Sequence, residues 1–143
     1  MKKENLVYAI LRYAMSLVFL WAFFDKLFGL GFATTAEKAW VHGGSPTAGF
    51  LTFAAKGPFA AVFHSMAGVA VVDWLFMLGL LFVGGTLLLN RYVKWGCLAG
   101  GVMLFLMYLA LLLPENNPLI DDHIIYILVL ALIALHHEQK QPV

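Results

Sequence analysis

Four apolar segments, each long enough to cross a lipid bilayer as a helix, constrain this chain more than any other feature. They lie at about residues 6–32, 68–89, 93–113 and 119–135. About 20 mainly apolar residues are needed, because a helix rises about 1.5 Å per residue across about 30 Å of hydrocarbon. The segments are continuously apolar and do not alternate, which disfavours membrane-spanning strands. The sequence therefore predicts an all-α integral membrane four-helix bundle, a single domain over residues 1–143.

The composition agrees with a membrane protein and excludes several functions. Hydrophobic residues make up 62% of the 143 residues and charged residues 12%, whereas soluble domains contain about 25% charged residues. The formal net charge of +1 provides no basic field for nucleic acid. Cys97 is the only cysteine, so no disulfide or cysteine metal cluster can form within one chain. We expect the lipid bilayer as a partner and no nucleic acid.

Positive charges in the short connections set the expected orientation. Lys2 and Lys3 precede the first apolar segment, Arg91 and Lys94 lie between the second and third, and Lys140 follows the fourth. Short cytoplasmic loops are rich in lysine and arginine, and the link at residues 114–122 contains neither. The first segment is too long for a secretory signal and is expected to remain a helix. We therefore expect four spans in a prokaryotic cell membrane, with both termini in the cytoplasm.

The connection at about residues 33–67 is long and unusually apolar. Gly-Gly, Ser-Pro and Gly-Pro pairs divide it by turns. Several of its large side chains would be costly in open water, so the segment is expected in the headgroup region or folded over the helices as a lid. These side chains are Phe50, Leu51, Phe53, Phe59, Val62 and Phe63. Because loops of this length are often functional, we expect a partly helical extracytoplasmic loop that contributes to a site.

Ionisable residues in the apolar segments require a partner, water or a function, since each costs about 2.5–3.5 kcal/mol on insertion scales. Arg12, near the inner end of the first segment, is expected to reach the headgroups through its long side chain. Most of the others gather at the expected outer end, with aromatic residues at the same level. They form a candidate shared pocket, and its members are Trp21, Asp25, Lys26, Trp40, Asp73, Asp122, His123 and Tyr126.

Two interpretations of the acids remain open. Aspartates at helix N-termini bind free backbone N–H groups and favour the helix dipole, which would account for Asp73, Asp121 and Asp122 without any site. Capping does not explain Asp25 and Lys26 at the end of a helix. These neighbours point about 100° apart, so we expect Lys26 to pair with Asp73 or Asp122 instead. We predict no metal, because the spacing that places several ligands on one helix face is missing.

Five sequence stretches, in the order given, carry a resemblance to a known family. They are VFLWAFFDKLFGLGF, AWVHGGSPTAGFL, KGPFA, VVDWLFMLGLL and NPLIDDHIIY. With them the chain resembles the DoxX/DoxD family of four-helix membrane proteins from Arg12 to Tyr126. The resemblance implies a membrane subunit of a thiosulfate:quinone oxidoreductase, which oxidises thiosulfate to tetrathionate and passes the electrons to a quinone. It also implies quinone as a cofactor and a smaller DoxA-like subunit as a partner.

Three functions from different classes are compatible with these features. In the first, a quinone ring lies near the candidate pocket's aromatic residues, Asp122 or His123 exchanges its protons, and Lys26 attracts thiosulfate. The second is a non-catalytic subunit that binds a lipid or quinone, or assembles a redox partner at the membrane. The third is a small-solute carrier, although the sequence lacks the broken half-helices of many transporters. Whether the protein is an enzyme stays open, and a homo-oligomer is compatible with each function.

Overall fold

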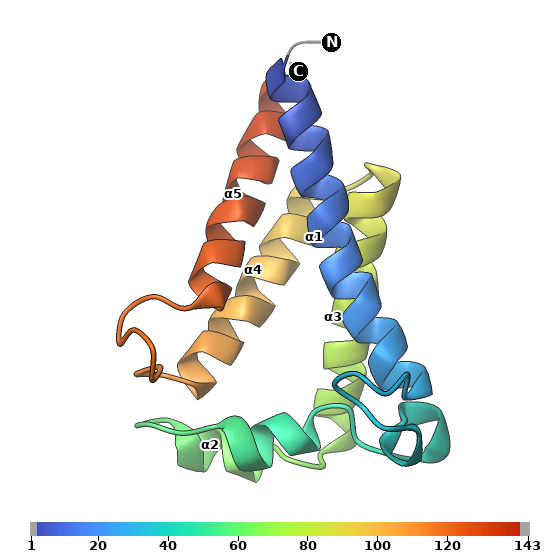
Figure 1. Ribbon diagram of the computed structural model, residues 1–143, viewed down its shortest axis with the longest axis vertical. Helices are drawn as coiled ribbons and strands as arrows, with labels where there is room; N and C mark the ends of the chain where they lie inside the picture. Colours follow the sequence, from blue (N-terminus) through green and yellow to red (C-terminus); the bar gives the residue numbers. More distant parts are fainter. Residues whose placement is uncertain (1–2, 141–143) are drawn as a thin grey trace.

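The computed structural model describes residues 3–140, and these residues are helical or irregular, with no strand. The long helices are α1 (Lys3–Phe28), α3 (Ala70–Leu89), α4 (Val93–Ala110) and α5 (Asp122–Lys140), as Figure 1 shows. The loop between α1 and α3 contains the short helix α2 (Ala60–Ser65), the 3₁₀ turns η1 (Ala36–Lys38) and η2 (Trp40–His42), and the π-helical turn η3 (Phe50–Ala54). The predicted all-helical class is confirmed.

Three helices, α1, α3 and α4, are long and apolar enough to cross a membrane. Their outward side chains are large and apolar, as at Leu17, Leu75 and Leu98, which suits hydrocarbon better than water. The prediction of a membrane protein with spanning helices is therefore supported by the structure. α5 is not among the three, because polar residues occupy its first turn and its last two turns.

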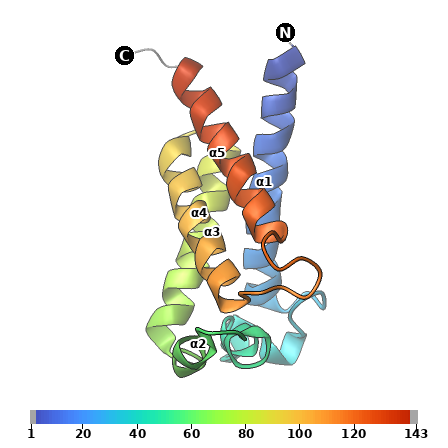
Figure 2. The ribbon, with the colours of Figure 1, turned by 90° about the vertical axis from the view of Figure 1, so that its left-hand side faces the viewer.

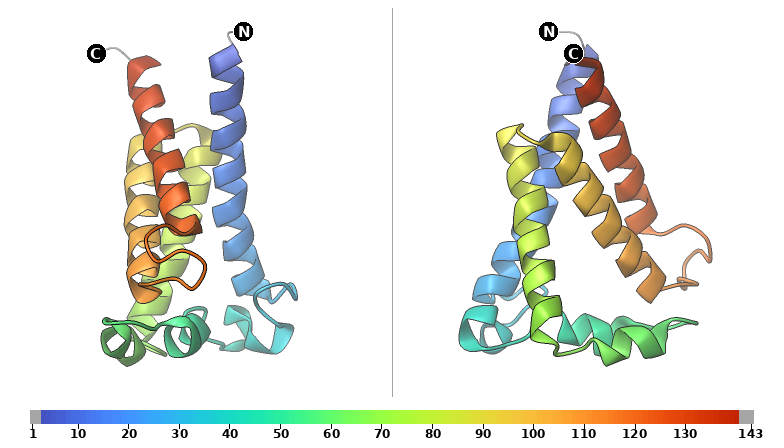
Figure 3. Two further views of the ribbon diagram at one scale, coloured as in Figure 1. Left: turned by 60° about the vertical axis from the view of Figure 1, so that its left-hand side comes forward. Right: turned by 180° about the vertical axis from the view of Figure 1, so that it is seen from behind.

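The long helices pack in the order α1, α3, α4, α5, and α5 also contacts α1. The start of α1 and the end of α5 lie at one end of the molecule, and the long loop lies at the other, as Figure 2 shows. α3 and α4 are joined at the first end and diverge toward the loop, where α2 and η3 cross between them (Figure 3). The loop therefore closes the end at which two helices separate.

Two helix ends differ from the predicted bounds for local reasons. α1 ends at Phe28, not at residue 32, because Gly29 adopts a left-handed φ of 67°. A Cβ at Gly29 would lie 2.5 Å from the carbonyl oxygen of Thr35, so only glycine allows the chain to turn back there. α5 begins at Asp122, not at residue 119, because the Asp121 carboxylate accepts the N–H groups of His123 and Ile124 at 3.0 and 3.3 Å.

Close packing along the helices depends on small residues. A Cβ at Gly100 of α4 would lie 2.9 Å from the Leu130 side chain and 3.0 Å from that of Val83. At Gly96, one turn earlier, it would collide with the Thr86 hydroxyl. Such close approach supplies van der Waals packing between helices where lipid gives no hydrophobic drive. The Gly96 and Gly100 positions therefore hold α4 against α3 and α5.

Arg12 lies inside the helix packing, beside the end of α3. It is 6% exposed, and its Nη1 donates to the carbonyl oxygens of Leu87 and Leu88, the latter at 3.2 Å. One turn further along α1, the Ser16 hydroxyl donates to the Gly84 carbonyl oxygen at 2.7 Å. The last carbonyls of a helix have no partner within it. These carbonyls of α3 therefore bind Arg12, a partner that the sequence did not predict.

Candidate functional site

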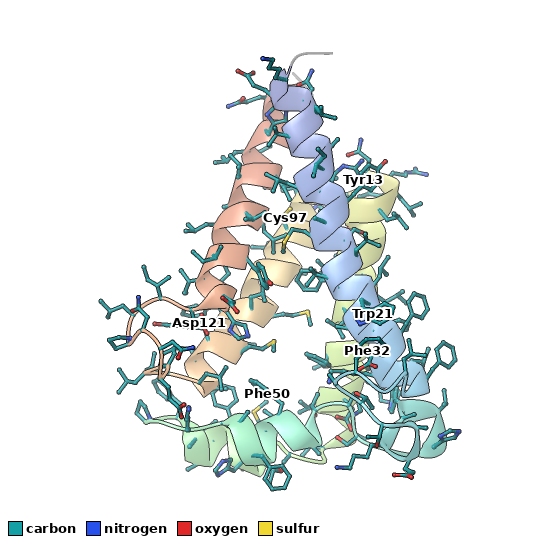
Figure 4. The ribbon with its side chains drawn as sticks, viewed as in Figure 1. Tyr13, Trp21, Phe32, Phe50, Cys97 and Asp121 are labelled. Carbon is teal, nitrogen blue, oxygen red and sulfur yellow. The ribbon has the colours of Figure 1, made fainter. Side chains whose placement is uncertain are left out.

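A cavity of about 270 Å³ lies between α3 and α4 and is covered by the long loop. The two helices contribute Val72, Leu75, Phe76, Met103, Leu106 and Met107. The loop contributes Pro46, Thr47, Phe50, Leu51, Phe63 and Met66. Figure 4 shows Phe50 in the space between the diverging ends of α3 and α4, just above α2. We call this space the lid cavity.

The wall of the lid cavity is apolar except at two residues. Lys26, from the last turn of α1, is the only charged residue in the lining, and Thr47 is the only hydroxyl. The Thr47 hydroxyl already donates a hydrogen bond to Asp73. Of residues 3–140, Lys26 is therefore the one charged group presented to a molecule in the lid cavity.

Lys26 has no carboxylate partner among residues 3–140. The ion pairs in that part of the chain join Lys56 to Glu115, Lys94 to Glu138 and His123 to Asp121. The Lys26 ammonium lies over the Phe76 ring, whose centroid is 6.0 Å from Nζ. The expected pairs of Lys26 with Asp73 or Asp122 do not form, because Asp73 binds the loop and Asp122 is exposed.

Asp25 fastens the beginning of the loop to α1. Its carboxylate is 1% exposed, and its two oxygens accept the backbone N–H groups of Phe32 at 3.2 Å and Ala33 at 3.0 Å. The turn at Gly29 brings these amides back to the helix end. An acid at this helix C-terminus is therefore explained by its hydrogen bonds to the chain that follows. Asp25 does not line the lid cavity.

Asp73 fastens the middle of the loop to α3. It is 6% exposed, and one oxygen accepts the Ser45 hydroxyl at 2.8 Å, the Thr47 hydroxyl at 2.5 Å and the Thr47 N–H at 3.3 Å. The N-cap of α3 is Val69, with no side-chain cap bond. The capping interpretation is therefore wrong for Asp73, whose carboxylate holds the Ser-Pro-Thr turn at the edge of the lid cavity.

A third attachment joins the loop to α4. The Lys56 N–H donates to the Ala110 carbonyl oxygen at 2.8 Å, and the Lys56 ammonium binds Glu115 at 2.7 Å. The hydrogen bond from the Lys56 ammonium and its charge hold the pKa of the exposed Glu115 carboxyl below its ordinary value. Together with Asp25 and Asp73, these bonds attach the loop to three helices around the lid cavity.

The polar residues that begin α5 form a separate group. Asp121 accepts a hydrogen bond from His123 Nδ1 at 2.7 Å, and both side chains are largely buried, at 15% and 17% exposure. Asp122 is exposed, and Tyr126 packs against the helix core. The capping interpretation is confirmed for Asp121, and the cap geometry also makes Asp121 the partner of the histidine. None of these residues lines the lid cavity.

The two predicted tryptophans also lie outside the lid cavity. Trp21 is 50% exposed, and its ring meets that of Phe32 edge to face, with the centroids 5.0 Å apart. Figure 4 labels both residues near the loop end of α1. Trp40 is half-buried and meets Trp74 at 4.7 Å in the same manner. Of the eight residues predicted for a shared pocket, the structure therefore brings only Lys26 to this cavity.

The remaining lining residues were not predicted as site residues, although some carried a signal. Phe50 and Phe63 belong to the apolar loop that we expected to form a lid. Met103 and Met107 are four residues apart and so share one face of α4, and methionine side chains adapt to irregular spaces. Two methionines on one face of α4 were therefore the feature of the sequence that could have predicted the helical wall of the cavity, which faces the aromatic loop.

Comparisons of the chain with protein-family models, with curated proteins and with solved structures found no match. The resemblance to the DoxX/DoxD family accordingly stays a prediction from the sequence, and the geometry of the lid cavity carries the functional argument.

Proposed function

We propose that the protein binds an apolar, membrane-soluble molecule, a lipid or a quinone, in the lid cavity. The observation that carries the proposal is a cavity of about 270 Å³ whose lining is apolar apart from Lys26 and Thr47. Ligand sites are typically concave and mostly apolar, with a few polar groups that orient the ligand. Flexible methionine side chains in the wall suit a ligand of variable shape.

The exposure of two lining residues supports access from the side of the membrane. Leu75 of α3 and Leu106 of α4 line the lid cavity and are still 67% and 49% exposed. In a bilayer, these exposed faces contact lipid, so a membrane-soluble molecule reaches the cavity between α3 and α4 without crossing water. The loop, attached to α1, α3 and α4, closes the cavity toward the end of the molecule.

The proposed topology includes α5 as a fourth span, which completes a four-helix bundle. α5 packs along α4 and also contacts α1, which supports its placement among the spanning helices. Lys94 pairs with Glu138 at 2.5 Å at the end opposite the loop, so the polar last turns of α5 lie beside the basic α3–α4 link. With that link in the cytoplasm, both termini are cytoplasmic and the long loop is extracytoplasmic.

Binding is better supported than catalysis at this cavity. A quinone that is reduced requires a proton donor within hydrogen-bond reach. The carboxylates of Asp25 and Asp73 accept loop hydrogen bonds, and His123 binds Asp121 outside the cavity lining. The family resemblance favours a quinone as the occupant, with thiosulfate oxidation and a DoxA-like subunit outside this cavity. A binding role without chemistry requires none of these residues as a proton carrier.

Two substitutions at neighbouring positions of α3 test the proposal. Val72 lines the lid cavity, whereas Val71 does not and is 65% exposed. Val72→Phe adds volume inside the cavity, and Val71→Phe makes the same change on the outer surface. Protein in lipid nanodiscs is titrated with decylubiquinone and with palmitate, and binding is measured by native mass spectrometry.

We expect saturable binding of at least one probe, weakened about tenfold or more in Val72→Phe, since overpacking costs about 1–3 kcal/mol. Val71→Phe should bind as the unmodified protein does. Absence of saturable binding to either probe, or equal loss in both variants, would refute a ligand site in the lid cavity.

A further inference from the structure

Asp25 and Asp73, two acids at the same end of the helices as Lys26, bind the loop. The carboxylate of Asp25, the neighbour of Lys26 in the chain, accepts two loop N–H groups, and that of Asp73 accepts three loop donors on one oxygen. Among residues 3–140, no acid forms an ion pair with Lys26. Both carboxylates are therefore held by the loop, and neither forms a direct ion pair with the lysine.

A lysine in an apolar wall favours an anionic ligand. Burying a charge away from water is costly unless the charge is paired and hydrogen-bonded. A hydrogen bond between an ammonium and a carboxylate or phosphate is about twice as strong as one between neutral groups. An acidic group on the ligand would thus supply the partner that residues 3–140 do not.

The rest of the wall excludes a small hydrophilic anion. Apart from Lys26 and Thr47, the lining consists of apolar residues. An ion such as thiosulfate would lose its hydration there and gain only one charged partner. A hydrocarbon chain, in contrast, buries apolar surface against every other wall residue. The lining therefore fits a molecule with one acidic end and an apolar body.

The dimensions of the cavity limit the number of chains. Its volume of about 270 Å³ lies near the lower limit of drug-sized ligand sites, about 300 Å³, so the cavity favours a ligand with one acyl chain over one with two. Val72 and Phe76 are four residues apart on α3, as are Met103 and Met107 on α4, so each pair forms a stripe along its helix. A single chain fits between the two stripes.

We propose that the ligand is a single-chain anionic amphiphile of the fatty-acid class, with its carboxylate at Lys26 and its hydrocarbon chain between α3 and α4. This inference rests on the proposed binding function and names the ligand class of the same cavity. Leu75 and Leu106, which are exposed at the cavity wall, mark the side on which the end of the chain meets lipid.

The test compares two probes that differ only in the polar end. Palmitate and hexadecanol have chains of the same length, but only palmitate is anionic. Each is titrated into protein in phosphatidylcholine nanodiscs, for the unmodified chain and for Lys26→Met and Lys26→Arg. Lys38→Met is the matched control. It removes an exposed lysine of η1, at the same end of the molecule as Lys26, that does not line the cavity.

We expect the unmodified protein to prefer palmitate by about tenfold or more, as for a hydrogen bond between charged groups. Lys26→Met should bind both probes equally, whereas Lys26→Arg and Lys38→Met should keep the preference. Equal affinity of the unmodified protein for both probes, or a preference that survives in Lys26→Met, overturns the assignment of the anionic end. If hexadecanol still binds and Val72→Phe abolishes its binding, the proposed function survives that failure. If neither probe binds any variant, the fatty-acid assignment fails, and the proposed function fails with it only if decylubiquinone does not bind either.

Discussion

Replacing Asp73 by alanine should detach the middle of the loop from α3. The buried carboxylate oxygen accepts the Ser45 hydroxyl and both the hydroxyl and the N–H of Thr47. Alanine removes all three bonds at once. The Thr47 side chain, which is 6% exposed, and its N–H would then lack these acceptors in a setting with little access to water. The local opening of residues 44–56 should become more frequent, while the helices stay folded.

The expected size follows from the bonds that are lost. A hydrogen bond to a charged group contributes about 1.5–3 kcal/mol net, but bonds that share one acceptor are not additive. Two such contributions at the low end give about 3 kcal/mol for the three bonds together. Since about 1.36 kcal/mol corresponds to a factor of ten, the open fraction of the loop should rise about a hundredfold.

Hydrogen exchange followed by mass spectrometry measures this opening directly, in peptides that cover residues 44–56. Asp73→Asn keeps an oxygen acceptor without the charge, so its increase should be smaller, about tenfold. Asp122→Ala removes an exposed acid at the start of α5 and should leave exchange in the loop unchanged. Exchange that stays the same in Asp73→Ala would refute the conclusion that this carboxylate holds the loop.

Three further predictions concern the helices and the outer attachment of the loop. Arg12→Met should lower the free energy of unfolding by about 1.5–3 kcal/mol, measured by denaturation in detergent, because the last carbonyls of α3 lose a charged donor; an unchanged value would contradict its role there. Gly96→Ala should destabilise the helix packing because its Cβ collides with α3, whereas Gly101→Ala, with nothing within 4 Å, should melt at the unmodified temperature; equal melting of both would refute the close contact. The pKa of Glu115 is lowered by Lys56, so the ion pair stabilises the loop fully above the ordinary pKa of 4.5 and is lost as the pH falls through the lowered value. Glu115→Gln should therefore remove the acid-dependent part of hydrogen exchange near residue 56, and an identical pH dependence in both proteins would count against the pair.

Much of the helical fold could be predicted because it depends on segment length and composition. A continuous apolar run has few ways to satisfy its backbone in lipid other than a helix. The loop was predicted to lie in the headgroup region or to fold over the helices as a lid for a similar reason, since its large aromatic residues require an apolar surface. The structure places Phe50 and Phe63 in the cavity wall, but Phe53 is 87% exposed, because its place in η3 turns it outward. Composition therefore identified the loop as a segment that covers an apolar surface, but it did not predict which of its side chains point toward the cavity.

The candidate site was harder to predict, because a position along a helix does not fix the direction in which a side chain points. Asp73 and Lys26 come from helix ends at the same level, yet Asp73 binds Ser45 and Thr47, and Lys26 lines the lid cavity. The path of the loop decides between these partners. That path depends on the left-handed turn at Gly29 and on the hydrogen bonds that follow it, which a single sequence does not specify.

The loop attachments and the ligand site are linked through Thr47. Its hydroxyl donates a hydrogen bond to Asp73, and the residue also lines the lid cavity. A ligand that contacts the closed loop binds with its intrinsic affinity multiplied by the fraction of molecules in which the loop is closed, so the affinity is reduced as that fraction falls. While the closed form remains the major one, that reduction is less than about twofold, even when opening becomes a hundredfold more frequent. Asp73→Ala should therefore change hydrogen exchange strongly and affinity little, unless the closed loop is stabilised by less than about 3 kcal/mol, the loss estimated for the three bonds. By reciprocity, a ligand that binds only the closed form suppresses opening as its concentration rises above its dissociation constant. Comparing exchange with and without palmitate in this variant would measure the linkage, and equal exchange under saturating palmitate would show that the ligand does not contact the closed loop.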